Sequence, residues 1–573
     1  MILNRRSFVS LGTAMAATPA LAALPKTTGR GDAGPYTDAI PAIEAYVAQY
    51  LAELGAPGLT LVLADRVAVR WVGSYGYADI GTRTPVTPDD QFQIGSITKS
   101  FVGLALLQLV EEGRVSVHDP IDRHLPGLRF ESPDAPITIH HLLTHSAALP
   151  DGPLFPGDPS FRHRPAGPLG RDFHYCNMGW RVLGQQIEHL DGSSLAECLQ
   201  RRLLTPLGMT HTAPVTSFEH ATRVIQSYWP ARSDRPYPTH GPLVVAPRIM
   251  ATDGAGCIAS TPADMGQYLL MLLNGGRLGN RRIVSPEAFA AFSTPHIEAA
   301  EFGNNAHYGY GIAVDSFDGH RRLRHTGGMV SFASALEVDT DSGFGVFASV
   351  NAMQGVRPRP VTEFALRALR ACRERRPMPK FPAPFDPRYV EQVAHYLGIY
   401  HNESGQSCEV VQEGAGLALK LGGKEPVKGL ISLEPVSGGA GVFVLAGASA
   451  SADLVVFPPA GTATPANGFG WGSSLYMRMG VSRPQPAPVP SAWHGFVGHY
   501  REEEVWTGTH HVILRAGQLW LDGIVPLEPA ADGRFWLRDE ATSPEWVLFG
   551  DVVGGRAMTM KLSGETLVRI TSG

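Results

Sequence analysis

Hydrophobic and polar residues alternate in different ways along the chain, and the change divides it into blocks. Up to about residue 376, apolar runs typical of strands stand near both ends, with helical periodicity between them. The strand runs predict two hairpins, one over 58–64 and 67–72 and the other over 331–338 and 344–350. Helical spacing is found over 96–112 and 264–273. We therefore expect an α+β block whose antiparallel sheet is assembled from both ends and flanked by helices.

The remainder of the chain reads as two copies of one pattern. Short alternating runs separated by Gly and Asp turns are typical of antiparallel sheets that close into barrels. Four segments recur in the same order: Tyr396-Leu-Gly-Ile-Tyr400 with Phe496-Val-Gly-His-Tyr500, Gly416-Leu-Ala-Leu419 with Gly517-Gln-Leu-Trp-Leu521, Leu433-Glu-Pro435 with Leu527-Glu-Pro529, and Leu454-Val-Val-Phe457 with Trp546-Val-Leu-Phe549. This repeat predicts two small, lipocalin-like β-barrels.

Proline-rich stretches mark the borders between these blocks. Residues 377–389 and 481–492 cannot donate the hydrogen bonds of an element interior, and we interpret them as linkers. The predicted domains are therefore 35–376, 390–480 and 493–573.

The first residues have the parts of an export signal. Arg5-Arg6 precedes Phe8, a weakly apolar stretch follows, and small residues end it at Ala20 to Ala23. This start resembles a twin-arginine signal. We expect residues 1–22 to be removed by cleavage near Ala22, which predicts a periplasmic or secreted protein. The stretch is shorter than the roughly 20 residues that a membrane span needs, so a short-lived tether is the lesser alternative.

Composition removes several classes of function. The chain has 573 residues, of which 44% are hydrophobic, so it can bury a large core. Its formal net charge of −5 argues against nucleic acid as a partner. Five scattered cysteines form neither a C-x-x-C pair nor a disulfide scaffold.

A single lysine stands out in the first block. The chain has 48 basic residues, yet Lys99 is the only lysine between residues 27 and 379. Arginine can supply surface charge, but only an amine can lose its proton at a working pH. Lys99 follows Ser96 by three residues at a predicted helix start, where the two side chains share a face. An unprotonated lysine in this place is a general base for a serine nucleophile.

Two further motifs complete a resemblance to a known family. Tyr175-Cys176-Asn177 matches a Tyr-x-Asn motif, and His325-Thr326-Gly327 occupies the place of a Lys-Thr-Gly motif. Together with Ser96 and Lys99, over roughly residues 40–370, they resemble the serine hydrolases of the class C β-lactamase type, which include D-alanyl-D-alanine carboxypeptidases, D-aminopeptidases and esterases. Supporting matches are 142–150 and 254–260 with Asp264. The resemblance implies a β-lactamase/transpeptidase-like fold.

The resemblance also implies roles for the residues of these motifs. Ser96 is expected to form an acyl-enzyme, while Lys99 and Tyr175 exchange protons, for which neighbouring cations would have to lower the tyrosine pKa. Asn177, His325, Thr326 and Gly327 are expected to bind the substrate. Backbone N–H groups of Ser96 and Gly328 would form the oxyanion hole, the second on an edge strand.

His325 departs from the family's β-lactamases, which usually carry lysine there. An imidazole with an ordinary pKa of about 6.5 is mostly neutral at pH 7, which favours peptidase or esterase members. Turnover of a carboxylate substrate is then expected to show a pH limb that His325→Gln removes. The layout of one hydrolase block and two barrels resembles bacterial D-aminopeptidases, which remove N-terminal D-residues. A D-alanyl-D-alanine carboxypeptidase, a carboxylesterase and a class C-like β-lactamase remain alternatives.

The sequence also contains patterns that resemble other kinds of site. His141 and His145 stand four apart on a predicted helix, but the glutamate of H-E-x-x-H is missing, so no metal is expected. His510 and His511 are interpreted as barrel-strand residues, and no cofactor is expected. A slow penicillin- or peptide-binding module is the alternative from another class. The expected partners are a small peptide, amide or ester, and the barrels equally fit a role in covering the first block or in a homodimer.

Overall fold

The computed structural model describes most of the chain. It covers residues 29–570 apart from residues 126, 129, 133–134, 155–161, 232–242, 354–356, 383–389, 423–429, 437–440, 447–452, 460–464, 503–506 and 539–541. The predicted export signal at 1–22 and part of the first proline-rich linker lie outside the described residues. Within the described ranges, none of the helices has both the length and the apolar character that a membrane crossing requires.

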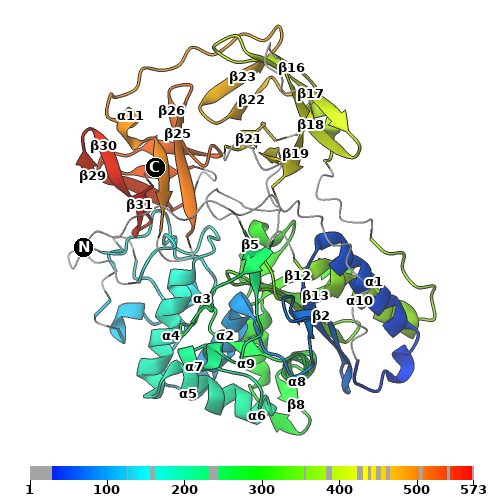
Figure 1. Ribbon diagram of the computed structural model, residues 1–573. Helices are drawn as coiled ribbons and strands as arrows, with labels where there is room; N and C mark the ends of the chain where they lie inside the picture. Colours follow the sequence, from blue (N-terminus) through cyan, green and yellow to red (C-terminus); the bar gives the residue numbers. More distant parts are fainter. Residues whose placement is uncertain are drawn as a thin grey trace, which may run out of the picture.

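A nine-stranded antiparallel sheet forms the centre of the first block (Figure 1). Its middle strands are the two predicted hairpins, and they are joined to each other because β1 pairs with β15. The sheet is thus assembled from both ends of the block, as predicted. The strand order is β10 (Ile297–Glu298), β11 (His307–Tyr308), β12 (Ala313–Phe317), β13 (His320–Gly328), β14 (Ala333–Asp339), β15 (Phe344–Val350), β1 (Gly58–Asp65), β2 (Val69–Asp79) and β3 (Thr84–Pro85).

Helices cover both faces of this sheet. On one face, α1 (Ala39–Leu54) packs against α10 (Arg359–Arg373), and their apolar residues share one core with strands β1 and β15. On the other face, α8 (Pro262–Leu273) lies on β1 and β15, and α2 (Thr98–Glu111) belongs to the larger core. Because both faces are covered, every residue of β1, β14 and β15 is buried.

Short elements fill the rest of the first block. The helices are α3 (Ile139–Leu143), α4 (Asn177–Asp191), α5 (Leu195–Leu199), α6 (Thr205–Leu207), α7 (Phe218–Ala221) and α9 (Pro286–Ser293). Three two-stranded sheets pair β4 (Phe92–Gln93) with β7 (Ala259–Ser260), β5 (Tyr228–Pro230) with β6 (Leu243–Val245), and β8 (Arg277–Leu278) with β9 (Arg281–Arg282).

Two closed eight-stranded antiparallel barrels follow, which confirms the predicted fold class. The first consists of β16 (Gly398–His401), β17 (Ser407–Glu413), β18 (Gly416–Leu421), β19 (Leu430–Pro435), β20 (Val442–Leu445), β21 (Val455–Val456), β22 (Gly468–Trp471) and β23 (Ser474–Arg478). After α11 (Trp493–Phe496), the second consists of β24 (Gly498–Arg501), β25 (Thr509–Arg515), β26 (Gln518–Leu521), β27 (Val525–Pro529), β28 (Phe535–Leu537), β29 (Trp546–Val553), β30 (Arg556–Leu562) and β31 (Glu565–Arg569).

A tyrosine–arginine pair locks each barrel in the same way. In the first, the Tyr400 hydroxyl donates to the Tyr396 carbonyl at 2.7 Å and accepts from Arg478 at 2.6 Å. In the second, the Tyr500 hydroxyl has the same two distances to the carbonyl of Phe496 and to its arginine, Arg569. Each arginine joins the last strand of its barrel to the segment before the first. The two repeats therefore share one arrangement of hydrogen bonds that closes the barrel, although the recurring segments of the sequence do not include the two arginines.

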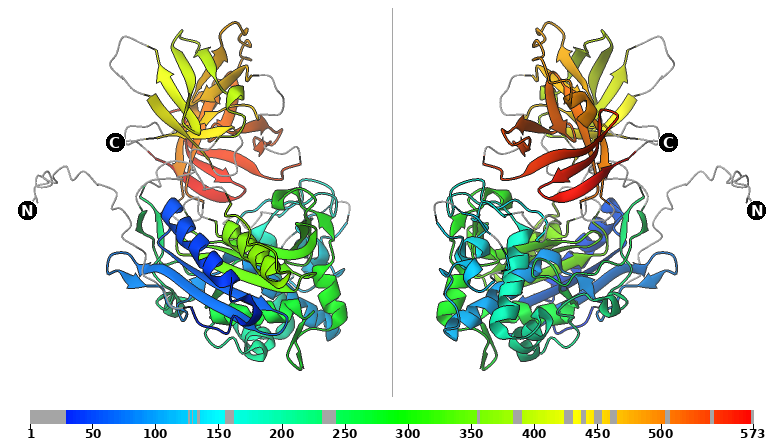
Figure 2. Two further views of the ribbon diagram at one scale, coloured as in Figure 1. Left: turned by 90° about the vertical axis from the view of Figure 1, so that its right-hand side faces the viewer. Right: turned by 90° about the vertical axis from the view of Figure 1, so that its left-hand side faces the viewer.

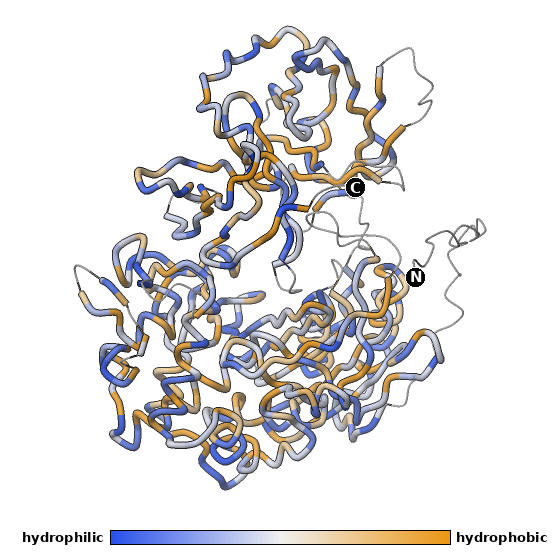
Figure 3. The backbone as a smooth tube through the Cα atoms, turned by 60° about the vertical axis from the view of Figure 1, so that its left-hand side comes forward, coloured by the Kyte–Doolittle hydropathy of each residue, from blue (hydrophilic) through white to orange (hydrophobic). Residues whose placement is uncertain are grey.

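The barrels lie together on one side of the first block (Figures 2 and 3). They contact each other through His511 and Asp453, whose side chains are 3.0 Å apart, and through Arg515, which donates to the Gly472 carbonyl at 3.3 Å. The second barrel contacts the first block at Asp151, whose N–H donates to the Glu545 carboxylate at 2.8 Å. The second barrel therefore meets the loop that lies beside the Tyr175-Cys176-Asn177 motif of the first block.

Candidate active site

Ser96 and Lys99 meet at the start of a buried helix. Ser96 lies in a single 3₁₀ turn, Gly95–Ile97, and α2 continues directly from it, so that Lys99 falls in the first turn. The Lys99 amine is fully buried and donates to the Ser96 hydroxyl at 3.0 Å. It also donates to Asn177 Oδ1 at 2.8 Å and to the Ala255 carbonyl at 2.9 Å. The spacing of three residues thus places the amine on the hydroxyl, as predicted for one helix face.

Burial changes the ionisation of this amine. Removal from water lowers the pKa of Lys99 from 10.5 to about 7, although the carboxylates of Asp151 and Asp253 act in the opposite direction. A large fraction of the side chain is therefore neutral near pH 7. The neutral amine can donate its two hydrogens to Asn177 Oδ1 and to the Ala255 carbonyl, which leaves its lone pair to accept from the Ser96 hydroxyl. Arginine in this position would stay charged. The geometry and the pKa together suit a base that removes the proton of Ser96.

Tyr175 and Asn177 stand at the start of α4, on the other side of Lys99. The Lys99 nitrogen lies 4.9 Å from the centre of the Tyr175 ring, and His145 stacks on that ring at 4.3 Å. The amide of Asn177 bridges Lys99 and Asp151, because its Nδ2 donates to Asp151 Oδ2 at 2.7 Å. Asp151 Oδ1 accepts the N–H of Met178 at 2.8 Å and so fixes the first turn of α4.

The expected lowering of the Tyr175 pKa is wrong. Burial raises the pKa of Tyr175 above its ordinary value, and the nearby carboxylates of Asp151 and Glu301 raise it further, while a hydrogen bond with Ser96 lowers it only in part. Lys99 lies over the face of the ring, where it does little for a phenolate oxygen. Tyr175 is therefore suited to donate a hydrogen bond as a neutral hydroxyl, which leaves proton removal to Lys99.

The third motif lies on β13, which is not the edge strand that was expected. β13 pairs with β14 along its length, and it pairs with β12 as far as Arg324. In the described register, residues 325–328 continue along β14 without a partner on the β12 side. The strand is therefore internal, yet its last four residues present a free edge towards Ser96. Because pairing with β12 ends at Arg324, the backbone of residues 325–328 is available to face Ser96, which is the property expected of an edge strand.

His325 is held as a neutral imidazole. The side chain is 1% exposed, its Nδ1 lies 2.6 Å from the Thr326 carbonyl, and its Nε2 lies 2.9 Å from the Tyr308 hydroxyl. The carbonyl can only accept, so Nδ1 carries the proton and Nε2 accepts from Tyr308. Burial, followed by the charge of Lys99, lowers the pKa of His325 to about 3. Titration of His325 is therefore not expected to produce a limb near neutral pH in the rate profile, in contrast to the expectation from the sequence.

Glycines bring the two expected oxyanion-hole segments together. A Cβ on Gly327 would lie 1.8 Å from the Ile94 carbonyl and 3.4 Å from the Ser96 nitrogen. Gly95 has a φ of +54°, and a Cβ there would lie 2.8 Å from the nitrogen of Gly328. Only residues without a side chain allow this approach. The backbone nitrogens of Ser96 and Gly328 thus come from segments in direct backbone contact, at the serine.

The supporting segments position the motifs. The segment 254–260 supplies the carbonyl of Ala255 to Lys99, and Asp264 accepts from the Thr212 hydroxyl at 2.8 Å. The helix predicted to hold both His141 and His145 ends at Leu143, and His145 lies beyond it with a φ of +57°. No group of three or more potential metal ligands occurs among the described residues.

Four residues of this site escaped the sequence reasoning. Asp151 follows the matched segment 142–150 directly, and that position was the available signal for it. Tyr308 lies outside the recognised motifs, and His174 directly precedes the Tyr175-Cys176-Asn177 motif without belonging to it. Glu545 lies 394 positions from its partner Asp151, so no local pattern connects the two.

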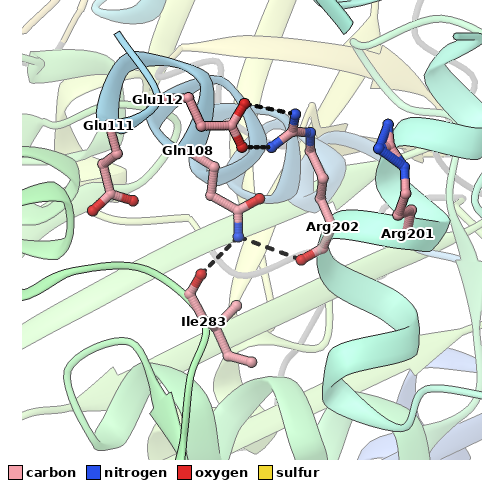
Figure 4. A pocket seen from close by; sticks show the side chains of 6 residues that line it. All are labelled: Gln108, Glu111, Glu112, Arg201, Arg202 and Ile283. Atoms are coloured by element: carbon pink, nitrogen blue, oxygen red, sulfur yellow. Dashed lines mark hydrogen bonds and ion pairs between the residues drawn. The ribbon is translucent and has the colours of Figure 1, made fainter.

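A hollow lies at the end of α2 that is farther from Ser96 (Figure 4). It has a volume of about 430 Å³ and is lined by Ile283 and by five charged or polar residues: Gln108, Glu111, Glu112, Arg201 and Arg202. Arg202 forms two hydrogen bonds with Glu112, at 2.6 and 3.0 Å, and is also bound by Asp191. The hollow is separated from Ser96 by most of a helix of 14 residues, about 20 Å. Its charges neutralise each other, and it holds no nucleophile.

The chain resembles known proteins in sequence over the first block, and in structure over a larger part of its length. The sequence profile of the family described as Beta-lactamase matches residues 43–370, more than half of the chain. Protein flp of Staphylococcus aureus (strain NCTC 8325 / PS 47) is 28% identical over 177 residues, which are 27% of this chain and 34% of flp. An uncharacterized protein of Mycobacterium tuberculosis (strain CDC 1551 / Oshkosh) is 28% identical over 283 residues, which are 42% of this chain and 68% of that protein.

The match to flp spans about a third of the length of that relative. Among solved structures, the octameric penicillin-binding protein homologue from Pyrococcus abyssi has a TM-score of 0.54 at 24% identity, over 77% of this chain and 100% of that chain. At this identity the likeness is one of fold.

Proposed function

The chain belongs to the beta-lactamase family, and on that premise we propose that it is a serine hydrolase whose nucleophile is Ser96 and whose general base is Lys99. One observation carries the proposal: the nitrogen of the buried Lys99 amine, whose pKa is lowered to about 7, lies 3.0 Å from the Ser96 hydroxyl, so that its neutral form can accept the hydroxyl proton. A serine hydroxyl is a weak nucleophile until a base takes its proton. Lys99 is placed and tuned to do so near neutral pH.

The reaction proposed for this site has two halves. Neutral Lys99 accepts the proton of Ser96 as Oγ bonds to the substrate carbonyl carbon, and the carbonyl oxygen becomes an oxyanion facing the backbone N–H groups of Ser96 and Gly328. The intermediate collapses to an acyl-enzyme, and the leaving group departs with the proton that Lys99 returns, with Tyr175 as hydrogen-bond donor. Water then attacks the acyl-enzyme carbonyl carbon and gives a proton to Lys99, and Lys99 passes a proton to Ser96 Oγ as the bond to the acid product breaks, so that both residues return to their starting states.

Charge near the site supports a substrate class. The carboxylates of Asp151 and Asp253 raise the pKa of Lys99, and those of Asp151 and Glu301 raise the pKa of Tyr175. The positive charge of Arg181 is paired with Asp253, at 3.3 Å. His325, in the place of the family's usual lysine, is neutral because burial lowers its pKa to about 3. These features favour a substrate with a free amine over one with a free carboxylate. We therefore propose a D-aminopeptidase-like enzyme that acts on short peptides or amides.

A carboxylesterase is the second candidate, and the neutral His325 favours it too. An ester without charge needs no ionic contact at the third motif. A D-alanyl-D-alanine carboxypeptidase and a class C-like β-lactamase have substrates with a carboxylate, for which the neutral His325 offers no cation at the third motif. The export predicted from Arg5-Arg6 remains part of the proposal and fits an enzyme of the periplasm or of the medium.

Two hydrolyses test the proposal, with Ser96→Ala as the blank. One substrate is D-alanine p-nitroanilide, which has a free amine, and the other is an N-acyl-D-alanyl-D-alanine, which has a free carboxylate. We expect turnover of the first and little of the second. Turnover of the second alone would assign a carboxypeptidase. If neither is turned over, p-nitrophenyl acetate serves as a third substrate, and its turnover would assign an esterase. Turnover equal in Ser96→Ala would refute Ser96 as nucleophile.

A further inference from the structure

The second barrel reaches into the first block through one carboxylate. Glu545 immediately precedes β29, and its Oε1 accepts the Asp151 N–H at 2.8 Å and lies 2.8 Å from His174 Nε2. Its Oε2 accepts from the hydroxyl of Ser563 in the same barrel. Both oxygens therefore have partners, and the side chain is only 18% exposed. A contact of this kind is screened far less than a surface ion pair.

The backbones of the two domains are also fitted to each other around Glu545. A Cβ on Gly152 would lie 1.9 Å from the Ser563 carbonyl, and a Cβ on Gly564 would lie 3.0 Å from the ring of Pro153. Two glycines, one on each side, thus allow the barrel turn at 563–564 to rest on the loop at 151–153. The Glu545 contact is therefore part of a close-packed junction.

The electrostatics of the junction favour an ion pair. Burial alone would lower the pKa of His174, but its hydrogen bond to Glu545 and the charge of that carboxylate raise it above its ordinary value. Burial would raise the pKa of Glu545, yet the bonds from His174, Ser563 and the Asp151 N–H hold it below its ordinary value. Each partner thus supports the charged form of the other.

A chain of hydrogen bonds leads from this junction to the proposed base. Glu545 fixes the backbone of Asp151, whose carboxylate accepts from Asn177 Nδ2 at 2.7 Å, and Asn177 Oδ1 accepts from Lys99 at 2.8 Å. Because a carboxylate can accept only from the NH₂ end of an amide, Asp151 decides which end of Asn177 faces Lys99. With the amide reversed, two donors would face each other and the amine would lose its acceptor.

We propose that Glu545 is a positioning residue of the active site: through Asp151 it sets the orientation of Asn177 and thereby the place of the Lys99 amine beside Ser96. The inference rests on the proposed function of Ser96 and Lys99. It gives the second barrel an indirect part in catalysis, because the carboxylate that positions Asp151 and Asn177 comes from that barrel.

The rate at which a fluorophosphonate labels Ser96 tests this without knowledge of the substrate. In that reaction Ser96 Oγ displaces fluoride from phosphorus while the base takes the serine proton, and mass spectrometry locates the adduct. In the full chain, we expect Glu545→Ala to lower the labelling rate by about 10- to 100-fold, the scale of a small misplacement of reacting groups. Glu545→Gln retains an oxygen for the Asp151 N–H, and we expect it to recover most of the rate.

Controls separate positioning from general damage to the barrel. Glu528, which pairs with Arg538 at 2.8 Å on the exposed side of the same barrel, gives the matched variant Glu528→Ala, with an expected rate equal to that of the parent. Should Glu545→Ala fail to fold, Glu545→Asp keeps the charge but is one methylene too short for both partners, and the same loss is expected. In an Asp151→Ala background, Glu545→Ala should cost less than threefold, since its effect passes through that side chain.

The outcomes distinguish the two proposals. If the parent protein is not labelled at Ser96, the proposed function fails. If the parent is labelled and the folded Glu545 variants are labelled equally fast, the inference about Glu545 fails while the proposed function stands. A loss of the same size in Glu545→Gln and Glu545→Ala, or an undiminished loss in the Asp151→Ala background, also overturns the positioning role.

Discussion

Replacing Lys99 by methionine removes the amine that contacts Ser96 and makes its ionisation measurable in the stability of the fold. The pKa of Lys99 falls from 10.5 to about 7 because the folded protein buries it. Each pKa unit corresponds to about 1.4 kcal/mol, so burial of the charged form costs about 5 kcal/mol. That cost is fully present below about pH 7, where the amine is charged in both states, and it disappears as the pH approaches 10.5.

The sign of the effect follows from proton counting. Between pH 7 and 10.5 the unfolded chain holds a proton on Lys99 that the folded chain lacks, so the free energy of unfolding rises with pH by up to about 1.4 kcal/mol per unit. Lys99→Met lacks this slope. The variant also removes the amine from its three partners, the Ser96 hydroxyl, Asn177 Oδ1 and the Ala255 carbonyl. The stability lost with these contacts does not depend on this titration.

Urea unfolding of both proteins at pH 7, 8 and 9 measures the difference. The parent should gain about 2–3 kcal/mol relative to Lys99→Met over this range. Lys420→Met, which removes an exposed lysine paired with Glu409 on the first barrel, is the control and should not reproduce the slope. The same pKa should appear in kcat/KM, which should fall by about 100-fold from its plateau to pH 5. Parallel stability curves together with a flat rate profile would refute a buried amine that titrates near neutrality.

Three further predictions concern other parts of the structure. His325→Gln should leave the pH limb of kcat/KM near 7 in place, because burial lowers the pKa of His325 to about 3, and a limb that disappears in this variant would assign the titration to the imidazole. Gly327→Ala should abolish labelling of Ser96, because its Cβ would lie 1.8 Å from the Ile94 carbonyl. In the control Gly328→Ala, the Cβ meets only the flexible end of Met353 at 2.9 Å, and most of the labelling rate should remain. Equal labelling rates in the two variants would contradict the expected backbone contact. Arg569→Met should destabilise the second barrel by about 2–3 kcal/mol, since Tyr500 and the carbonyls of Val497 and Gly495 lose a charged donor; an unfolding transition of that barrel unchanged in urea would contradict this.

Local patterns predicted the fold well because its elements are local in origin. The hairpins at β1–β2 and β14–β15 follow from strand runs on either side of a turn, and the barrels follow from a repeat. The start of α2 could be predicted with its chemistry, because Ser96 and Lys99 are three residues apart. β13 was expected at an edge because no local signal reports how many strands a sheet adds beyond it.

The ionisation of the site could not be predicted, because it depends on packing in three dimensions. The Tyr175 pKa is raised by burial that no neighbouring residue in the sequence announces. The neutral state of His325 follows from Tyr308 and from the Thr326 carbonyl, and the first of these is on a different strand. Asp151 and Glu545 meet only when the second barrel lies on the first block.

The bond between Asp151 and Glu545 also sets an order of events during synthesis. The two residues are 394 positions apart, and a ribosome that adds about 5–20 residues per second needs roughly 20–80 seconds to travel from one to the other. Throughout that time the nascent first block can fold around Ser96 and Lys99, while the Asp151 N–H still lacks its hydrogen bond to Glu545. The junction between Asp151 and Glu545 therefore forms only after the second barrel has followed the first block off the ribosome, and on the positioning role proposed for Glu545 the full reactivity of Ser96 is delayed until that barrel has folded.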